Sequence, residues 1–390
     1  MNNGKFVFSQ IMAFLDHNEF NRCVDRYGGA RYVKHFSCWK QFLCMAFGQL
    51  THRESLSDTV LCLNSTGPKL YHLGIGKKIT KTTLSRANES RDWRIFADFA
   101  QSLIDEGRRL YGTDSQLDVE LKQNVFAIDS TVIDLCLNVY TWARFRKTKA
   151  AVKLHVQLDL KNSIPCFIHV SEGRVHDVTV LDLIDPEPDG FYVMDRGYKD
   201  FARLYRIDRA GAFFVTRAMD NLAFQRIYSA PADNLSGVLC DQTIRLTNPK
   251  PALRYPAKIR RIKFFDADLD RLFVFLTNNF ELPATDIAKL YKHRWQIELF
   301  FKWIKQHLKI KTFWGYEPNA VKTQIWIAIC VYVTVAIVRK KLQLKLSLYE
   351  ILQIVSISIF DKTPLTTLFQ QPYLHVFNEP NCNQLKLFDF

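Results

Sequence analysis

The chain has 390 residues, of which 48% are hydrophobic and 24% are charged. This length and composition exclude a mainly disordered chain and leave enough apolar surface for two or three folded domains. Lysine and arginine number 53 against 39 acidic residues, and the net charge of +14 indicates a polyanionic partner, most often nucleic acid. The nine cysteines lack CxxC spacing, and Met1–Lys5 shows no secretory signal, so we expect reduced thiols in a cytosol.

Residues 1–118 are predicted to form an all-α N-terminal domain. Apolar residues recur at helical spacing around residues 39–47 and 54–63, and glycine and proline then interrupt the pattern. After this break, Thr80 is placed to cap a short helix that carries Thr82 and Arg86. The segment resembles the recognition helix of a helix-turn-helix and predicts DNA binding, although an ordinary surface helix fits it about as well.

From Val125 onward the pattern is that of an α/β domain. Residues 125–129 and 190–195 read as buried strands that each end in an acid, and residues 151–160 alternate at period two with residues 166–170 as an antiparallel neighbour. Asp177 is expected to cap a short helix. His155 is expected to be a strand histidine with an ordinary hydrogen bond.

A stretch at about 219–268 departs from this pattern and is predicted to be a small β insertion. Its strand-like pieces are separated by prolines, and the sheet pattern resumes at residues 271–277. A long helix is expected from Thr285 to about Lys309. The apolar run at residues 325–338 is too short to cross a bilayer and is predicted to be a buried core helix, so no membrane partner is expected. A C-terminal helical segment and tail would occupy residues 346–390.

Positive charge gathers in the second half of the chain. Residues 196–265 hold 14 basic against 5 acidic residues, and residues 286–341 hold 11 against 3. A phosphate-binding surface is therefore expected mainly from these two segments.

Three acids are candidates for one catalytic site. Asp129 and Asp195 follow apolar strands, and ligand sites gather at strand ends in α/β sheets. Glu298 lies in the long helix, where about 100° per residue places four polar residues within an arc of about 60°. These residues are Tyr291, Arg294, Glu298 and Lys305. The opposite face is apolar and is predicted to pack on the sheet through Ile297, Phe300, Phe301, Ile304 and Leu308. Alone, the polar stripe is equally typical of surface ion pairs on a helix.

Together these motifs resemble the DDE transposases of bacterial insertion sequences, in the cut-and-paste subgroup with a Tyr-x2-Arg-x3-Glu-x6-Lys signature. The resemblance rests on Ile128-Asp129-Ser130-Thr131, on Asp195-Arg196-Gly197-Tyr198 and on the helical signature from Tyr291 to Lys305. It covers about residues 120–340. It implies a ribonuclease-H-like catalytic core with a β-strand insertion, which we expect over residues 119–345.

The resemblance also implies the chemistry. Asp129, Asp195 and Glu298 would hold two Mg²⁺ ions, for which Mn²⁺ can substitute, and these ions would serve strand cleavage and transfer of the freed 3′-OH. DNA contacts are expected from a set of side chains comprising Tyr291, Arg294, Lys305, Arg196, Tyr198, Lys153, Thr82 and Arg86. The alternatives are a metal nuclease of the same fold without strand transfer and a non-catalytic repressor that binds the element ends.

The expected partners are the terminal inverted repeats and the target, both double-stranded DNA, bound by a homodimer on paired ends in the bacterial cytoplasm and nucleoid. Excision is expected to pass through hairpin ends, with a flipped base on an aromatic side chain. In the family pattern a tryptophan of the β insertion is one such platform, but residues 196–294 contain none. The aromatic candidates of the insertion are Phe224, Tyr228 and Tyr255, although burial is more common for each. Trp295 is expected to pack rather than stack on a base.

Overall fold

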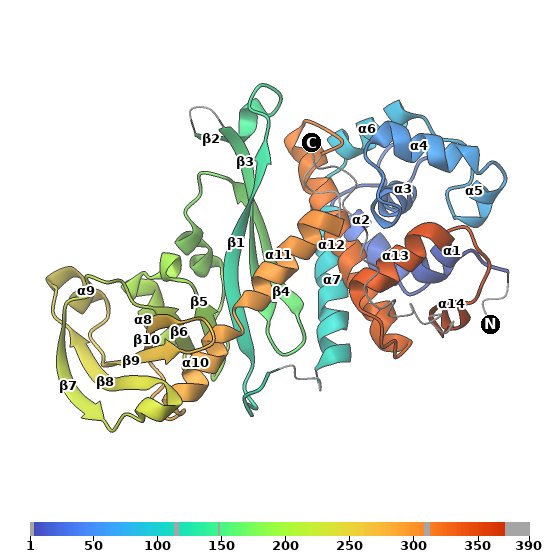
Figure 1. Cartoon of the computed structure of the whole chain (residues 1–390). Helices are drawn as coiled ribbons and strands as arrows, with labels where there is room; N and C mark the ends of the chain where they lie inside the picture. Colours follow the sequence, from blue (N-terminus) through green and yellow to red (C-terminus); the bar gives the residue numbers. More distant parts are fainter. Residues whose placement is uncertain (1–3, 113–116, 147–148, 308–312, 371–390) are drawn as a thin grey trace, which may run out of the picture.

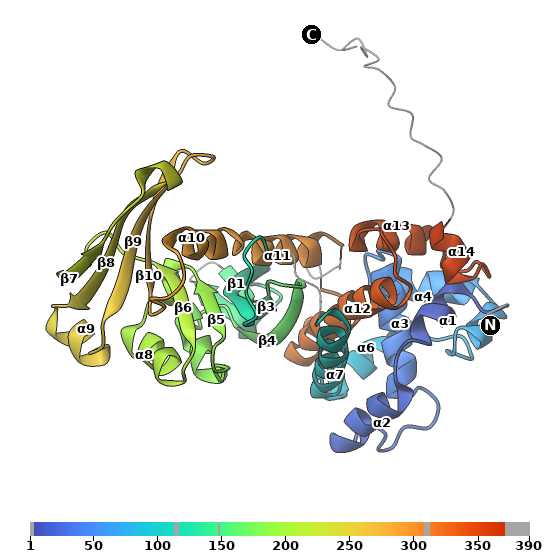
Figure 2. The same cartoon turned by 90° about the horizontal axis from the view of Figure 1, so that it is seen from below.

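The computed structural model describes residues 4–112, 117–146, 149–307 and 313–370, and it has two lobes (Figure 1). One lobe is helical and combines the first third of the chain with its C-terminal helices. The other is built on one large sheet. Helix α11 (Trp295–His307) runs along the sheet toward the helical lobe, as both views show (Figures 1 and 2).

Over residues 4–112, the helical lobe contains seven helices. They are α1 (Val7–Met12), α2 (His17–Arg26), α3 (Cys38–Leu50), α4 (Leu56–Ser65), α5 (Lys69–His72), α6 (Lys81–Ser90) and α7 (Arg94–Tyr111). Side-chain oxygens of Asp16, Ser37, Ser55 and Thr80 accept backbone N–H groups that the first turns of α2, α3, α4 and α6 leave unpaired. The predicted Thr80 cap is therefore confirmed, with Thr80 accepting from the backbone of Thr83 at 3.1 Å.

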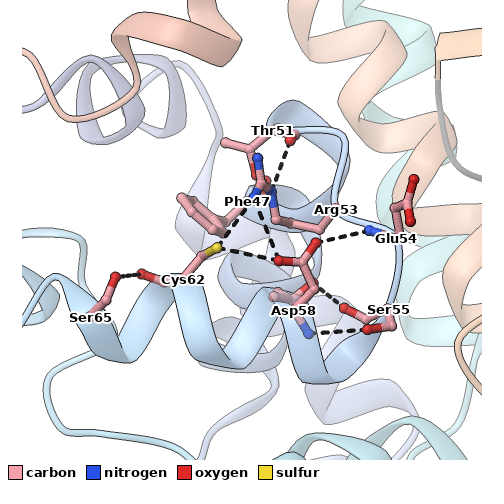
Figure 3. A network of polar contacts seen from close by, with 9 residues as sticks. Phe47, Thr51, Arg53, Glu54, Ser55, Asp58, Cys62 and Ser65 are labelled. Carbon is pink, nitrogen blue, oxygen red and sulfur yellow. Dashed lines mark hydrogen bonds and ion pairs between the residues drawn. The ribbon is translucent and has the colours of Figure 1, made fainter.

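A polar network fixes the corner between α3 and α4 (Figure 3). The Arg53 guanidinium lies 3.2 Å from Cys62 Sγ and 3.5 Å from the Asp58 carboxylate, and it bonds back to the Thr51 carbonyl. The Ser55 hydroxyl accepts the backbone N–H of Asp58. These contacts tie the end of α3 to the first two turns of α4.

Three C-terminal helices complete this lobe, namely α12 (Pro318–Lys341), α13 (Leu348–Ser358) and α14 (Leu365–Gln370). Helix α12 packs on α7, α3 and α6 and forms the centre of the lobe. It is long and apolar enough to cross a membrane, but 94% of its apolar window is buried inside the protein. The predicted core helix is confirmed, although the helix extends beyond the predicted run at both ends.

The second lobe is a ten-stranded sheet. Its strands are β1 (Val125–Leu135), β2 (Arg144–Arg146), β3 (Lys149–Asp159), β4 (Ile164–Glu172), β5 (Phe191–Met194), β6 (Phe213–Arg217), β7 (Phe224–Ala230), β8 (Val238–Leu246), β9 (Ile259–Asp266) and β10 (Arg271–Thr277). They lie in the order β2-β3-β1-β5-β6-β10-β9-β8-β7, and β4 pairs with β3. Strand β3 is antiparallel to β1. Strands β5 and β6 run parallel to β1 and are joined to each other through α8 (Phe201–Arg209). The predicted mixed α/β architecture is confirmed.

The predicted insertion extends this sheet. Strands β7, β8 and β9, with α9 (Pro249–Arg254), continue the sheet because β10 pairs with both β6 and β9. A nearly buried ion pair between Arg260 on β9 and Asp241 on β8 joins two of these strands at 2.6 Å. Backbone pairing therefore makes the insertion one edge of the same sheet.

The predicted long helix is two helices. Helix α10 (Ala284–Lys292) ends at His293, and α11 begins at Trp295. The backbone N–H groups of Gln296 and Ile297 bond to carbonyls only three residues back, which tightens the chain at the break. Helix α11 is described to His307, so the predicted end near Lys309 lies outside the described residues.

Candidate active site

The two aspartates lie side by side because β1 and β5 are parallel neighbours. Ile128 pairs with Met194 at the last position that the two strands share, and Asp129 and Asp195 are the next residues on each. Asp195 follows the end of β5 as predicted. Asp129 does not end its strand, since β1 runs on to Leu135 in antiparallel pairing with β3. The pairing of β1 with β5 ends at Ile128, one residue before Asp129.

Residues at the junction of α10 and α11 reach both aspartates. The Tyr291 hydroxyl donates to Asp195 Oδ1 at 3.3 Å. Arg294 donates from Nη1 to Asp129 Oδ2 at 3.0 Å and from Nη2 to Glu298 Oε1 at 2.5 Å. The three predicted catalytic acids are thus linked to one polar cluster, in which one guanidinium bridges two of them.

The structure also shows the positions of the other residues singled out on α11. Lys305 donates to the Val132 carbonyl on β1 at 2.8 Å, which places it on the same side as Glu298. Ile297, Phe300, Phe301 and Ile304 are buried as the apolar face requires. Leu308 lies outside the described residues.

Burial and nearby negative charge both raise the pKa of Asp129. Burial raises the pKa of Asp129 to about 6, and the nearby Asp195 and Glu298 act in the same direction. The Ser130 backbone N–H and the Arg294 guanidinium oppose this rise in pKa. Asp129 is thus hard to ionise beside Asp195 and Glu298. A cation bound among these carboxylates would offset their mutual repulsion, so cation binding would be strongly favoured.

The donor set fits a hard divalent cation, but the described residues hold no ready-made metal cluster of three or more His, Cys, Asp or Glu side chains. Asp129, Asp195 and Glu298 offer carboxylate oxygens, which suit Mg²⁺ and Mn²⁺. Arg294 occupies the space between two of them. Joint coordination therefore requires the Arg294–Glu298 ion pair to open.

Not every predicted DNA-contacting residue lies at this cluster. Arg196 is exposed beside Asp195, whereas Tyr198 is only 2% exposed and packs in the apolar core, where burial places its pKa well above the usual range. Lys153 is buried on β3. Thr82 and Arg86 lie on α6 in the other lobe and are exposed.

A polar network that was not predicted from the sequence lies next to Asp129. The predicted Asp177 cap is wrong, because the short 3-10 helix over Asp177–Leu183 has His176 at its cap position and no side-chain cap bond. Asp177 instead accepts from the Ser130 hydroxyl at 2.6 Å and pairs with Lys153 Nζ at 3.0 Å. Burial opposes ionisation of Asp177, but these partners lower its pKa. Because Ser130 follows Asp129, the network anchors the strand at the site.

His155 lies on the same strand as Lys153 and bonds through Nε2 to the Ser171 hydroxyl at 2.8 Å. The expected ordinary hydrogen bond is confirmed. Burial lowers the pKa of His155 to about 4, so the ring is neutral near pH 7.

An aromatic cavity of about 350 Å³ lies beside Glu298 and the two residues that contact the aspartates, Tyr291 and Arg294. It is bounded by β6, β9, β10 and the α10–α11 junction, and its lining includes Phe264, Phe273, Phe275, Tyr291, Trp295, Arg217, Arg271, Arg294 and Glu298. The guanidinium groups of Arg217 and Arg271 lie 5.3 and 5.4 Å from the centre of the Phe273 ring. Trp295 is 48% exposed and lines this cavity.

Comparison with known proteins gives the following matches. Residues 120–334 match the family described as "Transposase DDE domain", and residues 3–76 match a domain described as of unknown function. The chain is 31% identical over 306 residues to a protein of Sinorhizobium fredii named as transposase y4zB, covering 77% of this chain and 83% of that protein.

A protein of Geobacillus stearothermophilus named as a transposase for insertion sequence element IS5377 is 32% identical over 208 residues, which span 53% of this chain and 54% of that protein. A cryo-EM structure of a piggyBac transposase synaptic complex with hairpin DNA superposes on 90% of this chain and 79% of its own. The TM-score of this match is 0.48, and the sequence identity is 9%.

The raised pKa of Asp129 predicts a pH-dependent stability in metal-free protein. Between about pH 4 and pH 6 the folded state binds a proton that the unfolded state has lost, so this group stabilises the fold at low pH and the effect disappears as pH rises through about 6. The unfolding free energy, measured by urea denaturation in EDTA, should fall relative to Asp129→Asn across this window by roughly 2–3 kcal/mol. A wild-type–variant difference independent of pH would show that Asp129 titrates normally.

Proposed function

Because the chain belongs to the family of transposases with a DDE domain, whose members cleave and transesterify DNA, we propose that it moves a bacterial insertion sequence by a cut-and-paste reaction. The observation that carries this proposal is the linkage of Asp129, Asp195 and Glu298 through Arg294 and Tyr291. The ribonuclease-H-like core implied by the family supplies the sheet that holds the acids. We assign residues 119–345 to this catalytic unit and residues 1–118 to DNA binding.

Asp129, Asp195 and Glu298 would hold two Mg²⁺ ions, with Mn²⁺ as a substitute. Such a pair neutralises charge on the attacking and leaving oxygens of an in-line displacement at phosphorus. The protein fixes the two aspartates on adjacent strands and brings Glu298 from a separate helix. If Glu298 held a metal ion instead of pairing with Arg294, the guanidinium would become available to a DNA phosphate, for which its planar donors are well suited.

Neighbouring cations and hydroxyls would position the scissile strand. Lys305 and Tyr291 flank the acids, and the exposed Arg196 adjoins Asp195. We propose that Lys305, Tyr291 and Arg196 contact phosphates of the scissile strand. Tyr198 and Lys153 fit a supporting role beneath the strand better, because Tyr198 packs in the apolar core and Lys153 pairs with Asp177.

The proposed partners are the terminal inverted repeats and a target duplex, within the bacterial cytoplasm and nucleoid. A metal nuclease without strand transfer remains the alternative of the same chemistry, and joining of a pre-cleaved end to a plasmid separates the two. A non-catalytic repressor is disfavoured, since end binding alone does not need three converging carboxylates.

We further propose a homodimer on paired DNA ends, because excision requires that two ends be held together. Light scattering of the protein on end duplexes should give two copies per pair. Full transposition activity from complexes with one copy per isolated end would contradict this assembly.

Replacement of the acids by amides tests the site. Asp129→Asn, Asp195→Asn and Glu298→Gln should each abolish cleavage of an end-labelled duplex while leaving its binding largely intact, because an amide loses the charge that holds a cation. Asp134→Asn is the matched control, since Asp134 is an exposed acid on the same strand β1. An Asp129→Asn protein that cleaves at the rate of the control would remove Asp129 from the site.

The aromatic cavity suggests how the second strand is cut. A tight hairpin strains base stacking, so an extruded base gains from an aromatic surface beside the reacting phosphate. The earlier candidates of the insertion fit poorly: Tyr255 is fully buried and donates to Asp208, and Phe224 is half-buried beneath Arg261. Tyr228 is exposed, but it lies on β7 at the far edge of the sheet. We assign the base to the cavity between Trp295 and Phe273.

This assignment predicts hairpin ends and a role for Trp295 in forming them. Denaturing gels of a singly end-labelled substrate should show a product near twice the strand length. Trp295→Ala should slow its formation on the order of tenfold, since base stacking contributes about 1–3 kcal/mol. Leu299→Ala, at a site of similar exposure on α11, should not. Absence of the long product at every time point would contradict the hairpin route.

A further inference from the structure

The break between α10 and α11 is held by side chains outside the acid cluster. His293 follows the last residue of α10, and Arg294, which bridges Asp129 and Glu298, comes next. The sequence predicts one continuous helix here, so local propensity does not explain the break. Contacts with distant parts of the chain therefore maintain it. His293 and Gln296, on either side of Arg294, make such contacts.

His293 lies between Gln296 and the segment at residues 117–124, which leads into β1. Its ring nitrogen Nε2 is 2.5 Å from Asp118 Oδ1, and Nδ1 is 3.2 Å from Gln296 Nε2. One tautomer satisfies both contacts, in which Nε2–H donates to the carboxylate and Nδ1 accepts from the amide. The hydrogen bond from His293 lowers the pKa of Asp118, so the acceptor is ionised near pH 7. The His293 side chain is only 15% exposed, whereas that of Asp118 is 64% exposed.

The segment that carries Asp118 is anchored on both sides of this residue. Val119 is buried in the main apolar core, and Leu117 and Leu121 pack against the same core. Apolar packing therefore fixes the backbone at Asp118, although its carboxylate is at the surface. A carboxylate on a fixed backbone can hold the His293 ring in one orientation.

Gln296 extends these contacts to the central helix of the helical lobe. Its Oε1 accepts from the Ser163 hydroxyl at 3.3 Å, and Ser163 lies in the turn between β3 and β4. The Ser163 carbonyl accepts from the hydroxyl of Tyr332, on α12, at 3.2 Å. The two residues around Arg294 are thus connected to both lobes. We call this set the break network, and it comprises Asp118, His293, Gln296, Ser163 and Tyr332.

The position of the Arg294 guanidinium depends on the backbone at the break. Its two terminal nitrogens donate to Asp129 on β1 and to Glu298 on α11. Both hydrogen bonds require a narrow range of positions, because hydrogen bonds weaken steeply with distance and angle. Groups at a reacting centre have to be held within about 0.5 Å of the productive geometry. A network that fixes residues 293 and 296 therefore acts on the acids through Arg294.

We infer that Asp118 and His293 are positioning residues for the cleavage reaction, which hold the break so that the Arg294 guanidinium stays beside the acids and meets the scissile phosphate. They act through Arg294 and not on the DNA. The inference rests on the proposed function, since it assumes that Arg294 serves DNA cleavage. It gives the segment between the helical lobe and β1 a part in the reaction.

Cleavage of an end-labelled duplex by the full chain in Mg²⁺ tests this role. Asp118→Ala removes the carboxylate that holds His293, and because the side chain is exposed, the fold should be retained. The variant disturbs positioning and leaves DNA binding alone. We therefore expect kcat to fall about ten- to a hundredfold, while KM for the duplex changes little. Thermal melting of the same variant checks that the fold is intact.

Asp268→Ala is the matched control. Asp268 is also an exposed aspartate that reaches the end of α10 from another segment, and it pairs with Lys292, the residue before His293, at 2.9 Å. An exposed ion pair of this kind contributes little, so kcat should stay near that of the parent. If Asp118→Ala cleaved with the kcat of this control, the inference would be overturned and the proposed function would stand.

A double-mutant cycle with Arg294→Lys shows whether Asp118 acts through Arg294. Lysine keeps the charge but loses the planar fork that reaches two acids at once. Asp118→Ala should therefore lower kcat less in the Arg294→Lys chain than in the parent. Equal losses in the two chains would mean that Asp118 acts independently of Arg294, which contradicts the inference.

Amide hydrogen exchange provides a readout that does not need cleavage. In metal-free protein, exchange at residues 293–297 should be faster in Asp118→Ala than in Asp268→Ala, because the break is then less firmly held. Equal exchange in the two variants would show that Asp118 does not hold the break. A parent chain that fails to cleave would overturn the proposed function, and the exchange comparison would still decide whether the break network exists.

Discussion

The candidate active site depends on one guanidinium, that of Arg294. Asp129 and Glu298 come from a strand and a helix, and two carboxylates near each other repel unless a cation lies between them. Arg294 supplies that cation from the break between α10 and α11, and its side chain is only 16% exposed. Removing it would leave Asp129 buried without its main counter-charge, so packing of α11 on the sheet and the electrostatics of the site are coupled.

The same contact explains how the site could change between states. An arginine that neutralises two acids does part of the work of a divalent cation, but it cannot activate a nucleophile as a metal can. Exchange of Arg294 for metals would free the guanidinium at the moment when DNA phosphates arrive. The aromatic cavity is lined in part by Tyr291, Arg294 and Glu298, so the space proposed for an extruded base adjoins the proposed position of the reacting phosphate.

Local patterns in the sequence were sufficient to predict the strands and the helix that carry the three acids. Short apolar runs predicted the strands before Asp129 and Asp195, and helical periodicity placed Tyr291, Arg294, Glu298 and Lys305 on one side. The break at Arg294 was not predictable, because the angular argument treats the helix as continuous and the break follows from contacts with two distant strands. Asp177 was misassigned for a similar reason, since its partners Ser130 and Lys153 lie on the distant strands β1 and β3. The continuity of β7–β9 with the sheet likewise rests on non-local pairing.

Anomalous diffraction from Mn²⁺ tests the central claim most directly, using crystals of the chain bound to a cleaved end duplex. The account predicts manganese peaks in contact with carboxylate oxygens of Asp129, Asp195 and Glu298, and Arg294 turned from Glu298 to a DNA phosphate. Manganese bound elsewhere, or bound by the aspartates with Glu298 still paired to Arg294, would contradict it.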